Sequence, residues 1–86
     1  LPHIGWNNID IINPTALTRG LEEINDFYFV HSYAFIPQKK SEIISNTFYG
    51  NSFVSMIQKD NIYGVQFHPE KSQRAGIKLI KNFLSQ

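Results

Sequence analysis

The sequence of 86 residues contains no cysteine, which excludes a disulfide framework, a thiolate metal site and a thiol nucleophile within the chain. No apolar run approaches the ~18 residues that a membrane span needs, so no membrane-spanning segment is expected. No N-terminal pattern in these residues suggests secretion, so the cytoplasm is the expected compartment. The net charge of +1 gives no electrostatic reason to predict a nucleic acid or an anionic membrane as a partner.

Charged residues are also few, at 17%, whereas 14% of the residues are aromatic, and this balance predicts a folded domain. A chain of this length buries a little over ~60% of its unfolded surface, which is enough for one small core. The sequence does not start with methionine and begins abruptly at Leu1-Pro2-His3. We therefore interpret residues 1–86 as part of one domain and expect further chain upstream.

The hydrophobic pattern predicts strands first and a helix last. Extended segments rich in aromatic and β-branched residues are expected at 1–8, extending into 9–12, and at 27–33, 43–49, 53–59 and 62–67. Gly50-Asn51 and Asp60-Asn61 are turn-forming pairs, so the last three strands are expected to form an antiparallel meander.

Helical signals are confined to two places. After a turn at 13–15, residues 16–21 are long enough for about one helical turn, and a polar loop is expected at 37–42. Near the end, Ile77, Ile80 and Leu84 recur at helical spacing and predict a helix over 73–84. Ser72 offers an N-cap oxygen for this helix.

The predicted strand 62–67 runs directly into His68-Pro69-Glu70, which holds a potential base and a carboxylate. Proline keeps the preceding residue extended, and alternate residues of an extended chain project to the same side, so both side chains should face one site. A carboxylate bonded to one imidazole nitrogen leaves the other free to accept a proton. For so short a pattern a purely structural role at a helix start is the commoner explanation.

Three separated segments together strengthen the catalytic interpretation. They are Pro2-His3-Ile4-Gly5-Trp6-Asn7, the run 27–33 (Phe-Tyr-Phe-Val-His-Ser-Tyr), and the run 63–72, which contains His-Pro-Glu-Lys-Ser. In order and spacing they resemble the class I (triad-type) glutamine amidotransferases, and within them the amidotransferase subunit of imidazole glycerol phosphate synthase. The resemblance spans the whole chain.

The resemblance implies a fold, a reaction and two catalytic residues. The fold would be α/β, the C-terminal portion of a flavodoxin-like three-layer domain with a mixed central sheet. His68 would be the base that activates a cysteine nucleophile, oriented by Glu70. In the family the cysteine elbow and the oxyanion strand lie upstream, and both are absent here. The isolated chain is therefore predicted to have no glutaminase activity.

Further residues acquire expected roles from the same resemblance. His31, Ser32 and Tyr33 match a segment beside the bound L-glutamine, although a core role for Tyr33 stays open. Trp6, Asn7, Tyr28 and Lys71 are expected to face a cyclase subunit with a (β/α)₈ barrel, which receives ammonia for histidine biosynthesis. An ordinary core role for Trp6 also stays open.

Alternative functions remain at this point. The chain could be a paralogue that supplies ammonia to a sugar-modifying partner, or a non-catalytic binding module with Trp6, Tyr28 and Tyr33 as an aromatic contact surface. The three histidines, His3, His31 and His68, lack the short spacing of metal ligands, so no metal or other cofactor is expected.

Overall fold

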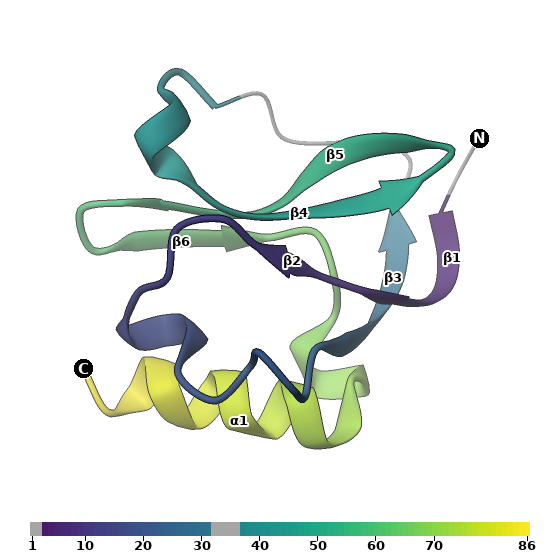
Figure 1. Cartoon of the computed structure of the whole chain (residues 1–86). Helices are drawn as coiled ribbons and strands as arrows, with labels where there is room; N and C mark the ends of the chain where they lie inside the picture. The colour runs from purple at the N-terminus through teal and green to yellow at the C-terminus, as the bar shows by residue number, and fades with distance from the viewer. Residues whose placement is uncertain (1–2, 32–36) are drawn as a thin grey trace.

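The computed structural model of the chain describes residues 3–31 and 37–86. Its strands are β1 (His3–Asn8), β2 (Asp10–Ile11), β3 (Asp26–His31), β4 (Ile43–Tyr49), β5 (Asn51–Lys59) and β6 (Ile62–Val65). One α-helix, α1 (Gln73–Leu84), follows them, and the 3₁₀ turns are η1 (Ala16–Thr18), η2 (Lys40–Glu42) and η3 (Pro69–Lys71). Figure 1 shows α1 on one side of the larger sheet, with the segment that contains η1 between them. Within the described ranges no helix is long and apolar enough to cross a membrane.

The larger sheet has the strand order β2-β4-β5-β6, and all its pairings are antiparallel. β4 and β5 are joined through Gly50, whose φ of 73° lies in the left-handed region that glycine adopts without a steric penalty. Asp60, with φ of 56°, serves the same purpose between β5 and β6, since aspartate tolerates this conformation better than most residues. The predicted meander of the last three strands is confirmed.

A second sheet is the antiparallel pair of β1 and β3, in which Trp6 lies opposite Tyr28. Several contacts connect this pair to the rest of the fold, among them one to β4 and one to the segment after β6. The Asn7 side-chain amide donates a hydrogen bond to the Phe48 carbonyl, 2.7 Å away, at the end of β4. Phe29 forms an isolated antiparallel bridge with Phe67, which follows β6. β3 is thereby tied to the segment that carries the His-Pro-Glu turn.

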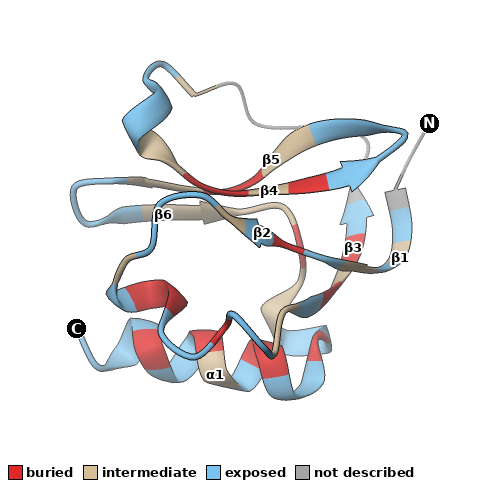
Figure 2. Ribbon diagram, viewed as in Figure 1, coloured by how far each residue is buried: buried red, intermediate tan, exposed pale blue. Residues whose placement is uncertain are grey.

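The core lies between the larger sheet and α1. Phe67 belongs to the core just before the His-Pro-Glu turn, with its ring centroid 4.0 Å from that of Phe27 and 5.6 Å from that of Phe29. Figure 2 shows the buried residues of α1 on the side that faces the sheet. The buried hydrophobic residues are Ile9, Leu17, Leu21, Phe27, Phe29, Ile44, Met56, Phe67, Ala75 and Leu79.

Most expected elements are confirmed, with differences at their ends. The strand 43–49 and the helix 73–84 have the predicted bounds. The helical turn expected within 16–21 is η1. β5 begins at residue 51 rather than 53. β6 ends at Val65 rather than 67. The Gln66 N–H still bonds to the Ser55 carbonyl of β5, but the chain then bends away and Phe67 pairs with Phe29 of β3. Residues 32–33 of the expected strand 27–33 lie outside the described ranges.

The prediction that Ser72 caps α1 with its side chain is wrong. Ser72 does precede the helix, but its hydroxyl makes no cap hydrogen bond. The hydroxyl bonds instead to two backbone groups outside α1, at Tyr28 and His68. The Ser72 hydroxyl thus bonds to a distant strand and to the preceding turn in place of the helix N-terminus.

Asn82 connects α1 to η1 and to the residue that follows η1. Its buried side-chain amide donates to the carbonyls of Leu17, at 2.9 Å, and Arg19, at 2.8 Å. We predict that Asn82→Ala lowers the free energy of unfolding by ~1–3 kcal/mol, because both acceptors lose their donor. Urea denaturation measures the change, with the exposed neighbour Lys81→Ala as control. Equal unfolding midpoints for the two variants would contradict the prediction.

Candidate active site

The His-Pro-Glu turn is built by the chain leaving β6. His68 is extended, with φ of −103° and ψ of 99°, and Pro69 begins η3 directly after it. This is the conformation expected of a residue before proline. The His68 N–H donates to the Tyr28 carbonyl at 2.8 Å, so the turn continues the pairing with β3 that begins at Phe67.

His68 and Glu70 meet, as the turn geometry predicts. The distance between His68 Nδ1 and Glu70 Oε2 is 2.9 Å. The His68 side chain is 38% exposed and that of Glu70 is 61% exposed. The imidazole is therefore oriented by a carboxylate while part of the ring remains accessible to another reactant.

The charge state of Glu70 fixes which ring nitrogen carries the proton. The hydrogen bond from His68 is the main cause that lowers the pKa of Glu70 below its usual 4.5, and its own backbone amide and the positive charge of Lys71 act in the same direction. At neutral pH Glu70 is ionised and can only accept hydrogen bonds, so His68 Nδ1 must donate. Nε2 then keeps the free lone pair that a general base needs.

We predict that the carboxyl of Glu70 titrates below 4.5 and returns toward that value in His68→Gln. Because the pKa is lowered in the folded state, the contact stabilises the fold above the unfolded-state pKa, and this contribution disappears as pH falls through the folded-state pKa. NMR titration of ¹³C-labelled glutamate measures both values. A Glu70 midpoint that does not respond to His68→Gln would show that the two side chains do not interact in solution.

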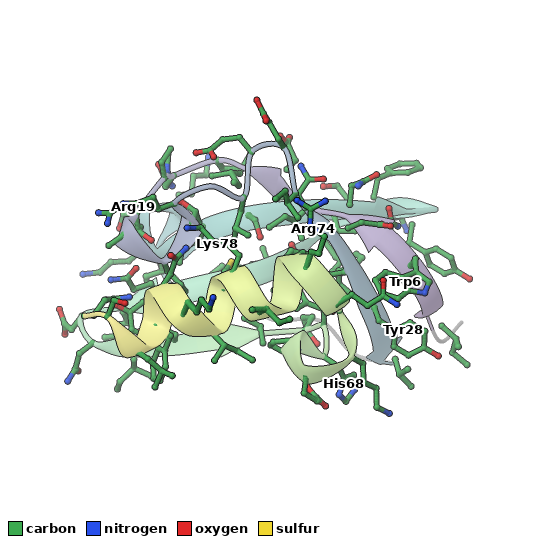
Figure 3. All side chains as sticks on the ribbon, turned by 90° about the horizontal axis from the view of Figure 1, so that it is seen from below. Trp6, Arg19, Tyr28, His68, Arg74 and Lys78 are labelled. Carbon is green, nitrogen blue, oxygen red and sulfur yellow. The ribbon has the colours of Figure 1, made fainter. Side chains whose placement is uncertain are left out.

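The aromatic residues expected at a partner surface lie at the same end of the molecule as His68, as Figure 3 shows. Trp6 and Tyr28 pack edge to face, with ring centroids 5.7 Å apart. Trp6 is 46% exposed, so it is not part of the core formed by the described residues. Lys71 is exposed directly after Glu70, whereas the Asn7 amide is engaged with Phe48.

The expected glutamine contacts cannot be placed in the same way. Ser32 and Tyr33 lie outside the described residues, as does the side chain of His31, the last residue of β3. Across residues 3–31 and 37–86 the structure brings together no group of three His, Asp or Glu side chains that could hold a metal ion.

Two residues that shape the turn were not predicted in that role. Ser72 is buried and bonded to His68 and Tyr28, and Gly76 lets α1 approach the carbonyl of Pro69. An isolated glycine inside a helical pattern is a signal of close packing, so Gly76 could have been noticed from the sequence. Nothing in the sequence identifies the partners of Ser72.

Comparison of the sequence with known proteins identifies the family of the chain. The family model described as "Glutamine amidotransferase class-I" matches residues 1–86. The chain is 49% identical over 85 residues to imidazole glycerol phosphate synthase subunit HisH of Pelagibacter ubique, an alignment that covers 99% of the chain and 41% of that relative. It is 50% identical over 86 residues to subunit HisH 2 of Methanococcus maripaludis, covering 100% of the chain and 43% of the relative.

The HisH subunit of Aquifex aeolicus is 47% identical over 83 residues, which cover 96% of the chain and 40% of that relative. The chain thus spans about two fifths of the length of the curated relatives that it matches. The family match extends over all 86 residues and includes the His-Pro-Glu turn. The chain therefore belongs to the class I glutamine amidotransferase family.

Proposed function

We propose that this chain supplies the histidine and the glutamate of a Cys-His-Glu triad that hydrolyses L-glutamine in the cytoplasm. The ammonia would pass to a cyclase subunit that makes imidazole glycerol phosphate in histidine biosynthesis. The observation that carries the proposal is the 2.9 Å contact between His68 Nδ1 and Glu70 Oε2 in a chain of this family. The similar relatives bear the name of a synthase subunit, which supports the choice of partner.

In the proposed reaction His68 transfers protons in both halves, the formation of the thioester and its hydrolysis. Its Nε2 takes the thiol proton, and the thiolate attacks the amide carbon of glutamine to form a C–S bond. His68 then returns the proton to the departing nitrogen as the C–N bond breaks and ammonia leaves. Water, deprotonated by His68, attacks the thioester carbon. The C–S bond then breaks to release glutamate, and His68 returns the proton to the sulfur, which regenerates the thiol. The ionised carboxylate of Glu70 stabilises the imidazolium formed in each step.

The thiol in this scheme belongs to protein outside these residues, because the chain contains no cysteine. The exposure of His68 and Glu70 is consistent with a site completed by other parts of the domain. We therefore keep the prediction that residues 1–86 alone show no glutaminase activity. His31, Ser32 and Tyr33 remain the proposed contacts of the glutamine substrate.

The proposed cyclase surface comprises Trp6, Asn7, Tyr28 and Lys71. Support comes from the exposed Trp6 ring, which packs edge to face with Tyr28, and from the position of both at the His68 end of the molecule. Large aromatic side chains with exposed edges commonly anchor protein interfaces. A partner docked here would cover the histidine and keep ammonia away from bulk water, where it would be protonated.

Growth without histidine tests the proposed function. A chimera in which residues 1–86 replace the matching 41% of the Pelagibacter relative is expressed in a bacterium that lacks its own HisH subunit. We expect growth with the chimera and none with its His68→Gln variant. A chimera that hydrolyses glutamine but does not restore growth would indicate a different ammonia acceptor, such as a sugar-modifying partner. A folded chimera with neither activity would favour the binding module.

A further inference from the structure

The hydroxyl of Ser72 lies at the centre of the turn that carries His68. Ser72 is 1% exposed, and its Oγ donates to the His68 carbonyl at 2.5 Å. The same oxygen accepts the backbone N–H of Tyr28 at 2.9 Å. A serine hydroxyl has one proton to donate, and here that proton is committed to His68.

These bonds form part of a closed circuit between the turn and β3. The His68 N–H donates to the Tyr28 carbonyl at 2.8 Å, and the Tyr28 N–H returns through Ser72 Oγ to the His68 carbonyl. Both backbone polar groups of His68 and both of Tyr28 are therefore engaged. Tyr28 and Ser72 are 44 positions apart in the sequence, so these bonds hold the turn against a distant strand.

The turn is also held from the side of α1. The Gly76 N–H donates to the Ser72 carbonyl at 3.2 Å. A Cβ at position 76 would lie 1.8 Å from the Pro69 carbonyl oxygen, which is far inside van der Waals contact. The absence of a side chain at Gly76 thus allows the first turn of α1 to support Ser72 and Pro69 directly.

The His68 side chain needs such support, because its own contact is weak. Its bond to Glu70 lies on the surface, and ion pairs between exposed groups contribute little to holding a geometry. The placement of the imidazole therefore depends also on the backbone from which it projects. That backbone is held by the N–H of His68 itself and by two donors to its carbonyl, the Ser72 hydroxyl and the Lys71 N–H at 3.1 Å.

We propose that Ser72 is a positioning residue for His68, whose hydroxyl keeps the imidazole directed at the reacting thiol and at Glu70. The proposal rests on the proposed function for the catalytic meaning of that direction. Small displacements of a base are costly: a misplacement of ~1 Å can lower a rate by ~10²-fold. Ser72 touches no substrate in this account and acts through His68.

The test uses Ser72→Ala in the chimera with the Pelagibacter relative. We expect kcat for glutamine hydrolysis to fall by about 10- to 100-fold, while KM changes by less than about twofold. The matched control is Ser55→Ala, which also removes a buried hydroxyl, one bonded to Ser45 Oγ at 2.8 Å within the larger sheet. Its kcat should equal that of the parent chimera.

A spectroscopic measurement tests the role of Ser72 independently of the proposed function. In ¹⁵N-histidine spectra the His68 ring should be protonated at Nδ1 in the parent chimera and in Ser55→Ala. In Ser72→Ala the ring should no longer be protonated at Nδ1 alone. His68→Gln identifies the resonance. An inactive parent chimera would overturn the proposed function, and the spectra would still decide whether Ser72 orients His68.

Two results would overturn the proposal. One is an unchanged kcat and an unchanged His68 ring state in folded Ser72→Ala. The other is an equal loss of kcat in Ser55→Ala, which would mean that any lost buried hydroxyl has the same effect. If Ser72→Ala does not fold, Ser72→Cys replaces it, because the thiol fills the same space and is a weaker donor. A parent-like kcat and ring state in Ser72→Cys would then count against the role of the hydrogen bond.

Discussion

His68→Gln in the chimera should lower kcat for glutamine hydrolysis by at least ~10³-fold, because general acid–base catalysis by one side chain is worth ~10²–10⁴ and both chemical steps depend on this one. Glutamine at this position can still donate and accept hydrogen bonds but cannot carry a proton between reactants. The free energy of unfolding should change little, since the side chain is 38% exposed and its bond to Glu70 lies on the surface. Steady-state ammonia release and thermal unfolding measure the two quantities.

Glu70→Gln is the matched variant for this comparison. It keeps the shape of the side chain and removes the charge that selects the Nδ1-protonated ring, so we expect a smaller loss, on the order of 10²-fold. A His68→Gln enzyme that retains more than a tenth of the parental kcat would be incompatible with a base at this position. A Glu70→Gln enzyme with full activity would remove Glu70 from the triad and leave His68 in place.

Gly76→Ala should destabilise the fold although helix propensity predicts the opposite. Alanine favours a helix interior over glycine by about 1 kcal/mol. The new Cβ, however, would lie 1.8 Å from the carbonyl oxygen and 2.8 Å from the carbonyl carbon of Pro69, and these are backbone atoms that cannot swing aside. We expect a loss of about 3 kcal/mol or more in the free energy of unfolding, at the upper end of the range for overpacking.

The sign of the change in the free energy of unfolding distinguishes the two effects of Gly76→Ala, helix propensity and the clash with Pro69. Ile77→Ala is the control in the same helix, since Ile77 is 57% exposed and its truncation should change stability by less than ~1 kcal/mol. Urea denaturation of both variants gives the comparison. An unchanged or increased stability of Gly76→Ala would contradict the close contact of α1 with Pro69. The same variant should also displace His68, because the Pro69 turn carries it.

The elements that the sequence predicted well are those with local causes. The helix 73–84 has the bounds expected from its apolar spacing, and the strand 43–49 is delimited by the polar loop before it and by Gly50. The meeting of His68 and Glu70 also follows from local geometry, since Pro69 restricts His68 and sets the separation of the two side chains. Neighbouring residues determine all of these features.

The features that the sequence did not reveal depend on distant partners. Ser72 has the residue type and position of a helix cap, yet its hydroxyl bonds to Tyr28, 44 positions away. The end of β6 at Val65, two residues earlier than expected, reflects the pairing of Phe67 with Phe29 in the other sheet. A local propensity cannot anticipate such choices, because the competing partner comes close only after the chain has folded.

The most direct test of the central claim is the rate of ammonia release from glutamine by the chimera, at saturating glutamine, beside the unsubstituted Pelagibacter relative. If His68 and Glu70 of this chain are the base and its orienting carboxylate, the chimera should reach a kcat within about tenfold of that relative. A folded chimera with intact His68 and no ammonia release above background would contradict the claim that this chain carries the catalytic pair of a glutamine amidotransferase.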